Sequence, residues 1–525
     1  MTLNTATQTS SPLVELFDQR KFTRRDDLTT AIRFQLAIDA LNGKWGTVTE
    51  LAKENNVSRA FIYSLCSVLK SAGEYLFGES GALPSCALAL EQTIGAILSF
   101  RLEGGNSLGS IATIMDRMGY LFTSVGFISQ TLSRIGALLP MTISTISGLQ
   151  QYIVFASDEI FSKTTPILIT VDPCSSAIVR MELSDSRKTE DWKKHFKEIN
   201  VNGFYSRLTV SDDAPGIIAA HNAVMGEAIR QSDTYHGIAH RLGNWTNRLE
   251  RTAYKAIRLE HVCEQKFNSA KSEQALEKCM VAYLRAIEAA DKAIALYDNF
   301  YGLYLNLIGE LNLFDRHGVL RLHPQVEETI THILTRMKAL KHSKIEKAVS
   351  QIERALPDLL HYFDVAKPII YELQKLPISD ACLKEFFLAW QWNKAVIKAK
   401  KKGRKNQARK HQQDHLDNAE YLCPPELKNI HAEVYSKLDE IVQGSAMVEC
   451  INSIVRPYLN TTKNQVTQEQ LNLIMFYHNH RRYREGKRKH NTPMELLTGK
   501  EQTDDWISMI FELLRAKDPE LLHAA

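Results

Sequence analysis

Three carboxylates stand where they could do chemistry together. Asp158 lies at the end of the strand-like run "YIVFASDEIF", Asp212 at the end of "YSRLTVSDD", and Glu449 in the helical pattern "AMVECINSIVRPYLN". If the two strands are neighbours in a sheet, Asp158 and Asp212 approach each other, and a helix packed across that edge adds Glu449. Such like charges repel one another unless a cation lies among them.

The predicted cation is Mg²⁺ or Mn²⁺, because carboxylate oxygens are the hard ligands that these ions prefer. Two such ions roughly 3.5 to 4 Å apart can activate an attacking oxygen and stabilise a leaving oxygen on a phosphodiester. In this interpretation Glu449 faces the ions while Val448, Ile451 and Val455 pack on the sheet. The three acids therefore predict metal-dependent phosphoryl transfer with two ions in each site.

Four other acids are alternatives to this set. Glu159 should point to the opposite face of the strand from Asp158, and Asp172 precedes Pro173 in a predicted hairpin turn. Asp213 directly follows Asp212 and is the alternative second acid. Asp233, in "SDTYHGIAH", is a candidate peripheral acid near a fifth strand.

Residue composition and periodicity predict the strands and helices that must position these acids. Runs rich in β-branched and aromatic residues predict strands in "YIVFASDEIF", "PILITVDP", "AIVRMELS" and "YSRLTVSDD", and "TEDWKKHFKEIN" has a helical period. The predicted order is strand, strand, strand, helix, strand. Beyond Pro215 the next proline is Pro324, and the chain between them is rich in Ala, Leu, Glu and Lys, which predicts long helices.

The N-terminal part has the pattern of a helix-turn-helix. In "WGTVTELAKENNVSRAFIYSLCSVLKS" Leu51 and Ala52 face inward and Val57 plugs the turn, while Ser58 caps a second helix that exposes Arg59 and Tyr63. Such a second helix enters the major groove of DNA. A similar helical pair is predicted further on, with Ser107 capping its first helix and Ser124 or Thr123 its second.

Basic clusters give further DNA-binding candidates. Residues 394–410 contain nine Lys or Arg and no acid, and "RRYREGKRKH" contains six Lys or Arg against one Glu. Such clusters favour contacts with phosphate over a bare solvated face. The predicted contacts are Lys400, Lys401, Lys402, Arg404, Lys405, Arg481, Arg482, Lys487 and Arg488.

Two pairs of ring residues allow a structural or a DNA-binding role. His236 and His240 have the spacing of two ligands on one helix face, but without a third ligand motif they are predicted to be structural or DNA-contacting histidines. Of Trp390 and Trp392, one is assigned to a core and the other is a candidate for stacking on a base.

At these motifs the chain resembles a family, the bacterial insertion-sequence transposases with an Asp-Asp-Glu triad on an RNase H-like, retroviral-integrase-type domain. The resemblance rests on "SDE", on "VSDDAPGI" and on "MVECINSIVRPYLN" with the later "QEQLNLIMFYHNHRRYREGKRKHNTPMELLTG", and it covers residues 150–235 and 441–500. The 237 positions between Asp212 and Glu449 depart from short-spaced members and imply a helical insertion that splits the catalytic domain.

The resemblance implies that Asp158, Asp212 and Glu449 are metal ligands. It also implies that five further residues contact DNA or steady the site: Asn452, Arg456, His478, Asn479 and Arg482. The implied activity is cleavage at the ends of a mobile element followed by strand transfer into target DNA. A structure-related nuclease, a non-catalytic DNA-binding protein and a transcription regulator are the alternatives.

Composition sets the broad limits. The chain has 525 residues, a formal net charge of +4 and 44% hydrophobic residues, as expected for a globular protein of several domains. Eight cysteines without a CxxC pair argue against a zinc ribbon or a disulfide scaffold. The N-terminus lacks the pattern of a secretory signal, and the charge-free residues 135–157 read as loop and strand and not as a membrane span. A bacterial cytoplasmic, nucleoid-associated location is therefore expected.

The predicted fold class is multidomain α+β or α/β, in which an RNase H-like mixed sheet is split by an all-helical insertion. The predicted segments are a helix-turn-helix domain (1–80), a second helical region (81–148), the first half of the catalytic domain (149–235), the insertion (236–440), the second half (441–505) and a helical tail (506–525). The expected partner is double-stranded DNA, both terminal inverted repeats and target, and a dimer or higher oligomer is expected because two ends must be joined together.

Overall fold

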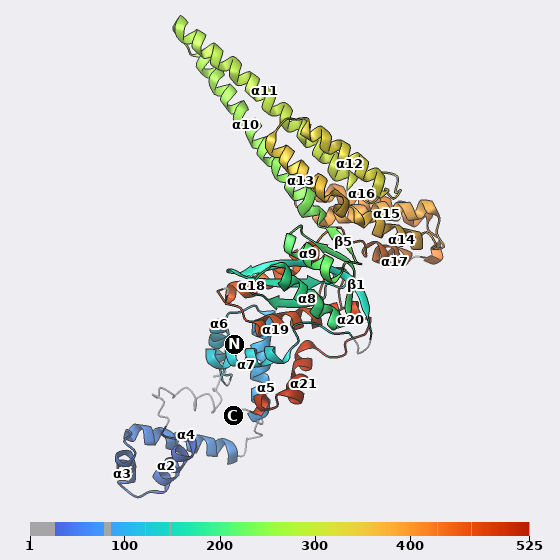
Figure 1. Cartoon of the computed structure of the whole chain (residues 1–525). Coiled ribbons are helices and arrows are strands. Elements are labelled where there is room, and N and C mark those ends of the chain that lie inside the picture. Colours follow the sequence, from blue (N-terminus) through green and yellow to red (C-terminus); the bar gives the residue numbers. More distant parts are fainter. Residues whose placement is uncertain are drawn as a thin grey trace, which may run out of the picture. The chain divides into compact units, whose positions relative to one another are not determined.

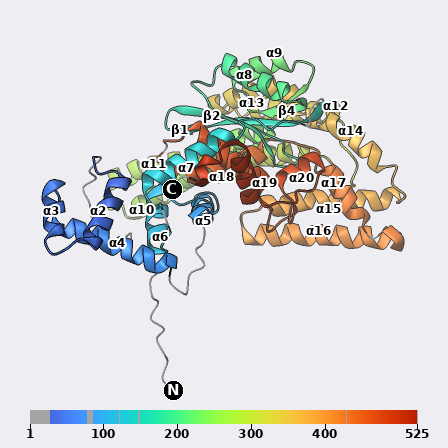
Figure 2. The same ribbon diagram turned by 90° about the horizontal axis from the view of Figure 1, so that it is seen from below.

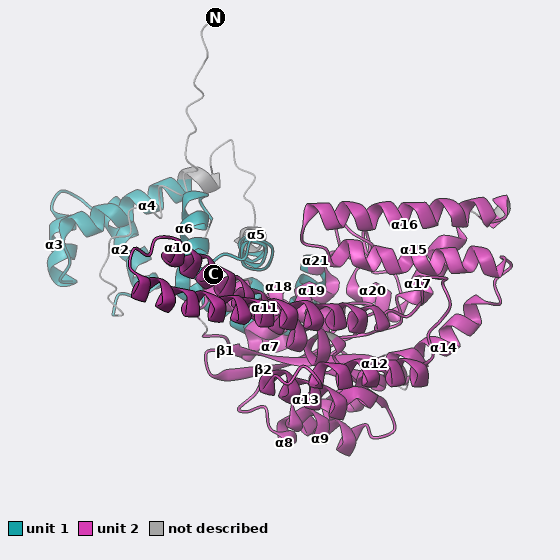
Figure 3. Ribbon diagram, turned by 90° about the horizontal axis from the view of Figure 1, so that it is seen from above, with its two compact units in different colours: residues 1–135, 507–525 teal, residues 136–506 magenta. Residues whose placement is uncertain are grey.

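The computed structural model describes residues 27–77, 86–120, 122–145, 149–427, 429–463 and 465–523. The chain forms two compact units, one of residues 1–135 with 507–525 and one of residues 136–506 (Figure 3). The second unit contains both halves of the predicted catalytic domain together with the predicted insertion. Residues 1–26, on which the expectation of no secretory signal rests, lie outside the described ranges.

The first unit begins with the helix-turn-helix pattern. Its helices are α2 (Thr30–Asn42), α3 (Thr47–Glu54) and α4 (Arg59–Phe77). The hydroxyl of Ser58 accepts a hydrogen bond from the backbone N–H of Phe61 at 3.1 Å, which confirms Ser58 as the cap of the second helix. Val57 packs against the core formed by Leu28, Leu36, Ala52, Ile62 and Cys66. The predicted helices and turn are confirmed.

The remaining helices of this unit come from both ends of the chain. They are α5 (Cys86–Leu98), the π-helix η1 (Ser99–Glu103), α6 (Leu108–Arg117), α7 (Val125–Leu138), α21 (Trp506–Lys517) and α22 (Glu520–His523). Ser107 caps α6 as predicted, and Ser124 rather than Thr123 caps α7. Ion pairs of Arg134 with Asp518 at 2.6 Å and of Arg515 with Glu91 at 3.2 Å join the C-terminal helices to this unit. The predicted tail is therefore part of the first unit.

The second unit is built on a five-stranded mixed sheet in the order β3-β2-β1-β4-β5. The strands are β1 (Gln151–Ser162), β2 (Thr165–Val171), β3 (Ile178–Leu183), β4 (Phe204–Ser211) and β5 (Ile229–Ser232). β1, β2 and β3 are antiparallel neighbours, whereas β1, β4 and β5 run parallel. The predicted neighbours β1 and β4 are confirmed, as is the mixed α and β composition.

Helices cover both faces of the sheet (Figure 2). One face carries α8 (Thr189–Val201) and α9 (Pro215–Val224), and the other carries α18 (Ala446–Thr461) and α19 (Gln468–His480). The short helix α20 (Pro493–Thr498) begins with a capping box formed by Thr492 and Glu495. Because successive side chains of a strand point to opposite faces, β1 sends alternate residues toward α8 and toward α18.

A helical block separates β5 from α18 along the chain. It comprises the π-helix η2 (Tyr235–His240), α10 (Arg241–Asn268), α11 (Glu273–Glu310), α12 (His323–Lys338), α13 (Ser343–Leu359), α14 (His361–Leu373), α15 (Asp380–Lys398), α16 (Lys402–Leu422), the short 3₁₀ helix η3 (Pro425–Leu427) and α17 (Ile430–Leu438). α10 and α11 form a long helical pair (Figure 1). One apolar core, which includes Phe300, Tyr362, Phe386 and Trp390, joins the block. Within the described ranges, no helix is long and apolar enough to cross a membrane.

Candidate active site

The two aspartates lie side by side at the edge where β1 and β4 separate. Ala156 of β1 pairs with Val210 of β4, so the same parallel register places Asp158 beside Asp212, directly after β4. Asp158 is not at the end of its strand, as the sequence suggested, because β1 continues to Ser162 through its pairing with β2. The Asp158 backbone is therefore paired with Ile169 of β2, whereas the pairing of β1 with β4 ends at Ala156.

Glu449 reaches the same place from α18. It lies in the first turn of that helix, and Val448, Ile451 and Val455 are buried beneath it, as predicted. One turn later the amide of Asn452 donates a hydrogen bond to Asp158 Oδ2 at 3.3 Å. A helix that packs on the sheet thus carries a carboxylate on its cleft side and an amide that orients the neighbouring aspartate.

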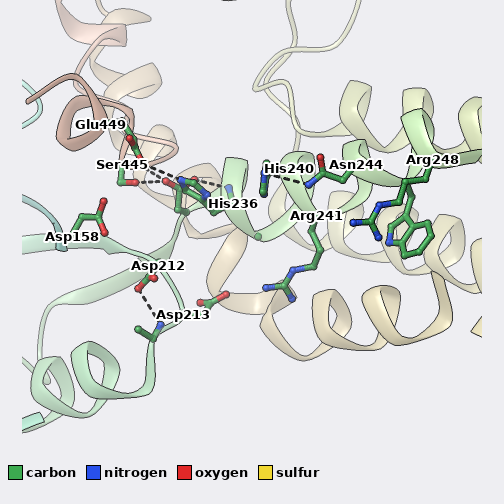
Figure 4. A pocket seen from close by; sticks show the side chains of 14 residues that line it. Asp158, Asp212, Asp213, His236, His240, Arg241, Asn244, Arg248, Ser445 and Glu449 are labelled. Atoms are coloured by element: carbon green, nitrogen blue, oxygen red, sulfur yellow. Dashed lines mark hydrogen bonds and ion pairs between the residues drawn. The ribbon is translucent and has the colours of Figure 1, made fainter. Parts of the chain in front are cut away.

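The three acids line one cleft of about 640 Å³. Figure 4 shows Asp158, Asp212 and Glu449 at one end of it, with the side chains of η2 and α10 continuing along its wall. Further lining residues are Asp213, Ala214, Asp233, His236, Gly237, His240, Arg241, Asn244, Trp245, Arg248 and Ser445. Acids therefore gather at one end, and histidine, asparagine and arginine follow them.

The pKa of Asp158 is raised at the acidic end of the cleft. Burial raises the pKa of its carboxyl to about 7, a hydrogen bond from the backbone N–H of Glu159 opposes that rise, and the charges of Glu159, Asp212 and Glu449 add to it. A cation among the acids would offset this repulsion. Among the described residues, the oxygens of the three acids do not all lie within 4.8 Å of one another. The all-oxygen chemistry of the three acids fits Mg²⁺ or Mn²⁺.

Asp233 lies directly after β5, lines the cleft and anchors the Glu449 helix. Its Oδ2 accepts hydrogen bonds from the backbone N–H of Ser445 at 2.8 Å and from the Ser445 hydroxyl, and its Oδ1 accepts one from the backbone N–H of His236 at 3.1 Å. A Cβ at Gly444 would approach Asp233 Oδ1 to 3.0 Å. The glycine thus permits the close contact that joins β5 to the start of α18.

His236 lies beside Glu449, one of the three candidate acids. Its Nε2 lies 3.6 Å from Glu449 Oε1, and the side chains of His236 and Glu449 are 40% and 46% exposed. The residue sits in η2, a π-helix, an element that recurs at functional sites. The sequence marked His236 as structural or DNA-contacting but did not place it beside Glu449.

The cleft wall on α10 was missed by the sequence reasoning. His236, His240, Asn244 and Arg248 recur every four residues, so they share one face of η2 and α10. The amide of Asn244 lies 3.3 Å from His240 Nε2, and the Arg248 guanidinium lies 4.9 Å from the centre of the Trp245 ring. The four-residue spacing in the sequence was the signal available, but only packing brings that face to the acids.

The other alternative acids have partners of their own. Asp213 accepts a hydrogen bond from Ser232 Oγ at 2.6 Å and lies 3.6 Å from Arg230 of β5. Asp172 accepts from the Ser175 backbone N–H at 2.8 Å, which confirms its turn role. Glu159 pairs with Arg187 at 2.5 Å on the α8 side, as the strand alternation predicted.

Of the two roles expected for His478 and Asn479, contacting DNA or steadying the site, their contacts fit the second. Both side chains are buried, and each bonds to backbone in or before β3: His478 Nε2 with Ser176 O at 2.9 Å, and Asn479 with both the N–H and the carbonyl of Ile178. Burial lowers the pKa of His478 to about 4, so its ring is neutral. These residues fix α19 against the hairpin that precedes β3.

The neighbouring basic residues are partly engaged within the chain. Arg482 bonds to Glu495 and to the carbonyl of His490, Arg488 bonds to the carbonyls of Pro173 and Cys174, and Lys487 pairs with Asp439. The Arg481 guanidinium lies 5.3 Å from the ring centre of Tyr477. Arg456 of α18 is exposed. DNA binding by these residues stays a prediction.

The basic run at 394–410 divides into a buried and an exposed part. Lys394 Nζ lies 3.7 Å from the centre of the Trp390 ring, and burial lowers the pKa of this amine to about 7. Trp390 is core, whereas Trp392 stacks on His411 with ring centres 4.5 Å apart. The predicted DNA contacts are exposed: Lys400, Lys401, Lys402, Arg404 and Lys405, and likewise Arg59 and Tyr63 on α4.

Comparison with known proteins adds little to this geometry. No protein-family model matches the sequence, and no curated protein matches it either. Among solved structures, the Drosophila P element transposase strand transfer complex matches 86% of this chain and 99% of its own chain, with 12% sequence identity and a TM-score of 0.28. A TM-score this low does not establish a shared fold. The resemblance to insertion-sequence transposases therefore stays a prediction, and function has to be argued from the cleft.

Proposed function

We propose that this protein is a DNA transposase that cuts the ends of a mobile element and joins them to target DNA by metal-dependent phosphoryl transfer. The observation that carries the proposal is the cleft in which Asp158, Asp212 and Glu449 meet, with the pKa of Asp158 raised by burial and by the other acids. A cluster of this kind stores negative charge that Mg²⁺ or Mn²⁺ neutralises on binding.

Asp158, Asp212 and Glu449 would hold the ions, two in each site. When bound, the ions supply charge that activates the attacking oxygen and stabilises the leaving oxygen. The chain's own residues position the ligands: Asn452 orients the Asp158 carboxylate, and Asp233 fixes the start of α18 so that Glu449 faces the cleft. His236 stands beside Glu449 and limits the orientations of its carboxylate.

The side chains of α10 that line the cleft would bind the DNA backbone. Arg241 and Arg248 line the cleft beyond the acids, and Asn244 lies between them. Arginine binds phosphate through paired N–H donors, so a strand whose scissile phosphate sits at the acids would place neighbouring phosphates on this wall. The reacting bonds are those of in-line transfer: water attacks the first phosphodiester, and the freed 3′ hydroxyl attacks the second.

The remaining predicted DNA contacts fall into separate surfaces. Arg59 and Tyr63 of α4 would read the terminal inverted repeats in the major groove, while the exposed run Lys400–Lys405 and the 481–488 segment would bind phosphates. Because both ends of an element must be cut and joined, the active assembly on DNA is a dimer or a larger oligomer.

The test uses labelled DNA cloned from the flanks of the coding sequence, with Mg²⁺ or Mn²⁺, and scores cleaved and joined products. We expect Asp158→Asn, Asp212→Asn and Glu449→Gln each to lower the cleavage rate by about 100-fold or more, because each removes charge stabilisation from the transition state. Glu227→Gln, at an exposed acid of the same unit, is the matched control and should keep the wild-type rate.

Three other results would change the proposal. Cleavage without joined product would make the protein a nuclease on this site. Full activity of Asp212→Asn together with loss in Asp213→Asn would move the second ligand by one residue. DNA binding that is unchanged by all variants, with no cleavage by the wild type, would indicate a non-catalytic DNA-binding protein.

A further inference from the structure

A second group of metal-ligand side chains lies away from the cleft, in the helical block. Among the described residues, one set of three histidine, cysteine or acidic side chains has possible ligand atoms that all lie within 4.8 Å of one another: His323, His361 and Asp364. His323 begins α12, and His361 and Asp364 lie in the first turn of α14. The group lies between 85 positions (Asp364 to Glu449) and 206 positions (Asp158 to Asp364) along the chain from the three cleft acids and shares none of them.

The two imidazoles converge on one carboxylate oxygen. His323 Nδ1 bonds to Asp364 Oδ2, and His361 Nδ1 lies 4.0 Å from the same atom. The ring centres are 5.9 Å apart with the planes at 88°. The 4.0 Å separation is too long for a hydrogen bond, so His361 is placed toward Asp364 without being bonded to it.

Neighbouring charged residues orient Asp364 and His361, as the residues around a metal site do. Lys367 Nζ bonds to Asp364 Oδ1 at 3.0 Å, which leaves Oδ2 facing the histidines. Behind His361, Asp358 Oδ1 lies 3.7 Å from Nε2, and Arg230 of β5 in turn pairs with Asp358. A carboxylate behind the distal nitrogen of a ligating histidine is the usual second shell of a zinc site, where it fixes the ring and its tautomer.

The chemistry of the three side chains also suits a metal. Imidazole nitrogens and carboxylate oxygens are both common ligands of divalent cations, and the group offers two imidazoles and one carboxylate. Hydrogen bonds with His323 and Lys367 hold the Asp364 carboxylate in place.

We infer that His323, His361 and Asp364 bind one Zn²⁺ ion, with a fourth position open to water. Two nitrogens and an oxygen in tetrahedral geometry are typical zinc ligands. With bonds of about 2.0 to 2.1 Å the ligand atoms of such an ion lie roughly 3.3 Å apart, so small rotations of side chains that already lie within 4.8 Å complete the site.

The ion would join three helices of the block to the sheet. α12 and α14 supply the ligands, α13 supplies Asp358, and β5 reaches Asp358 through Arg230. Arg230 also lies 3.6 Å from Asp213, next to the candidate second acid. Zinc at this place stabilises the base of the helical block and does not take part in phosphoryl transfer, so the inference stands apart from the proposed function.

The test is zinc binding by the full-length chain, freed of metal and titrated with Zn²⁺ against a chromogenic chelator, with the unfolding midpoint measured with and without zinc. A variant that carries both Asp158→Asn and Glu449→Gln removes binding at the cleft acids. In that background we expect one zinc per chain, and we expect His361→Ala and Asp364→Asn to lower its affinity at least about 10-fold, since even second-shell changes cost that much.

His332→Ala is the matched control, because His332 is an exposed histidine on α12 outside the group; it should bind zinc as the parent does. Asp364→Asn keeps the size of the side chain but loses the ion pairs of Asp364 with His323 and Lys367, so its zinc-free midpoint can fall; the expected result is that added zinc no longer raises the midpoint of this variant. The inference is overturned if the parent binds no zinc once the cleft acids are replaced, or if Asp364→Asn and His361→Ala retain the parent's affinity.

Discussion

Two clusters of buried charge lie on opposite faces of the same sheet, and they differ in how their charges are compensated. On the α8 face, Arg180 and His195 both bond to Glu182, whose pKa is about 2 because hydrogen bonds and charges from these two partners outweigh burial. On the α18 face, burial and neighbouring acids raise the pKa of Asp158 to about 7. Arg180 compensates the first cluster within the chain, whereas the second gathers acids around Asp158.

The α8 cluster continues as a chain of hydrogen bonds to β1, the strand that carries Asp158. His195 Nε2 lies 3.0 Å from Thr170 Oγ1, which lies 2.9 Å from Ser157 Oγ, and Ser157 directly precedes Asp158. Burial lowers the pKa of His195 to about 4, so the ring bonds as a neutral group. A satisfied buried network rigidifies its surroundings, and here it fixes β1 next to Asp158.

The largest effect on stability is expected from breaking the satisfied cluster. Glu182→Gln leaves the Arg180 guanidinium, whose side chain is 2% exposed, without its counter-charge. Loss of one partner from a buried pair costs about 3 to 5 kcal/mol. Denaturant unfolding should show this, whereas Glu190→Gln on the exposed side of α8, where the carboxylate is 81% exposed, should change the free energy of unfolding by at most about 1 kcal/mol. Equal effects of the two substitutions would contradict the comparison.

The opposite sign is expected at Asp158. A carboxyl whose pKa rises from about 3.9 in the unfolded chain to about 7 in the folded protein binds extra protons only when folded, so stability falls as the pH rises through that window. Asp158→Asn removes the charge and should therefore stabilise the metal-free protein at pH 8 by up to a few kcal/mol, at about 1.4 kcal/mol for each pH unit. At pH 4 the gain should vanish.

The unfolding midpoint, measured with and without Mg²⁺, distinguishes a metal site from an acid that is only close to other acids. Mg²⁺ should raise the unfolding midpoint of the wild type at pH 8 and should leave that of Asp158→Asn nearly unchanged. Glu449→Gln, at a side chain that is 46% exposed, should give a smaller gain without metal. A wild-type midpoint that does not depend on pH between 5 and 8 in the absence of metal would refute the uncompensated charge.

The smallest effect on stability is expected at Gly444, where the start of α18 packs against Asp233. Gly444→Ala places a Cβ 3.0 Å from Asp233 Oδ1, so the start of α18 has to shift; overpacking of this kind costs about 1 to 3 kcal/mol. The cleavage rate should fall further than stability alone explains, because Glu449 moves with the helix. Gly302→Ala in α11, with no atom within 4 Å of the added Cβ, should be neutral or stabilising by about 0.5 to 1 kcal/mol. Equal cleavage rates in the two variants would show that the contact does not position Glu449.

The sequence by itself determined the features whose signals are local. The sequence predicted the succession of strands and helix along the chain, the caps at Ser58 and Ser107, and the buried side of α18. These features follow from side-chain period and from hydrogen bonds within a few residues. Asp212 after β4 and Glu449 on α18 were placed for the same reason, whereas Asp158 was expected at a strand end and lies within β1. Such signals survive without knowledge of the fold because they depend on near neighbours along the chain.

Only the tertiary structure decided which distant residues share a site. Packing placed His236 beside Glu449, turned one face of α10 into the cleft wall, and brought His323 to His361 and Asp364. It also gave His478 and Asn479, which were expected either to contact DNA or to steady the site, buried hydrogen bonds to β3 and to the turn before it. These contacts join residues tens to hundreds of positions apart, and burial and direction exist only once helices and strands have packed.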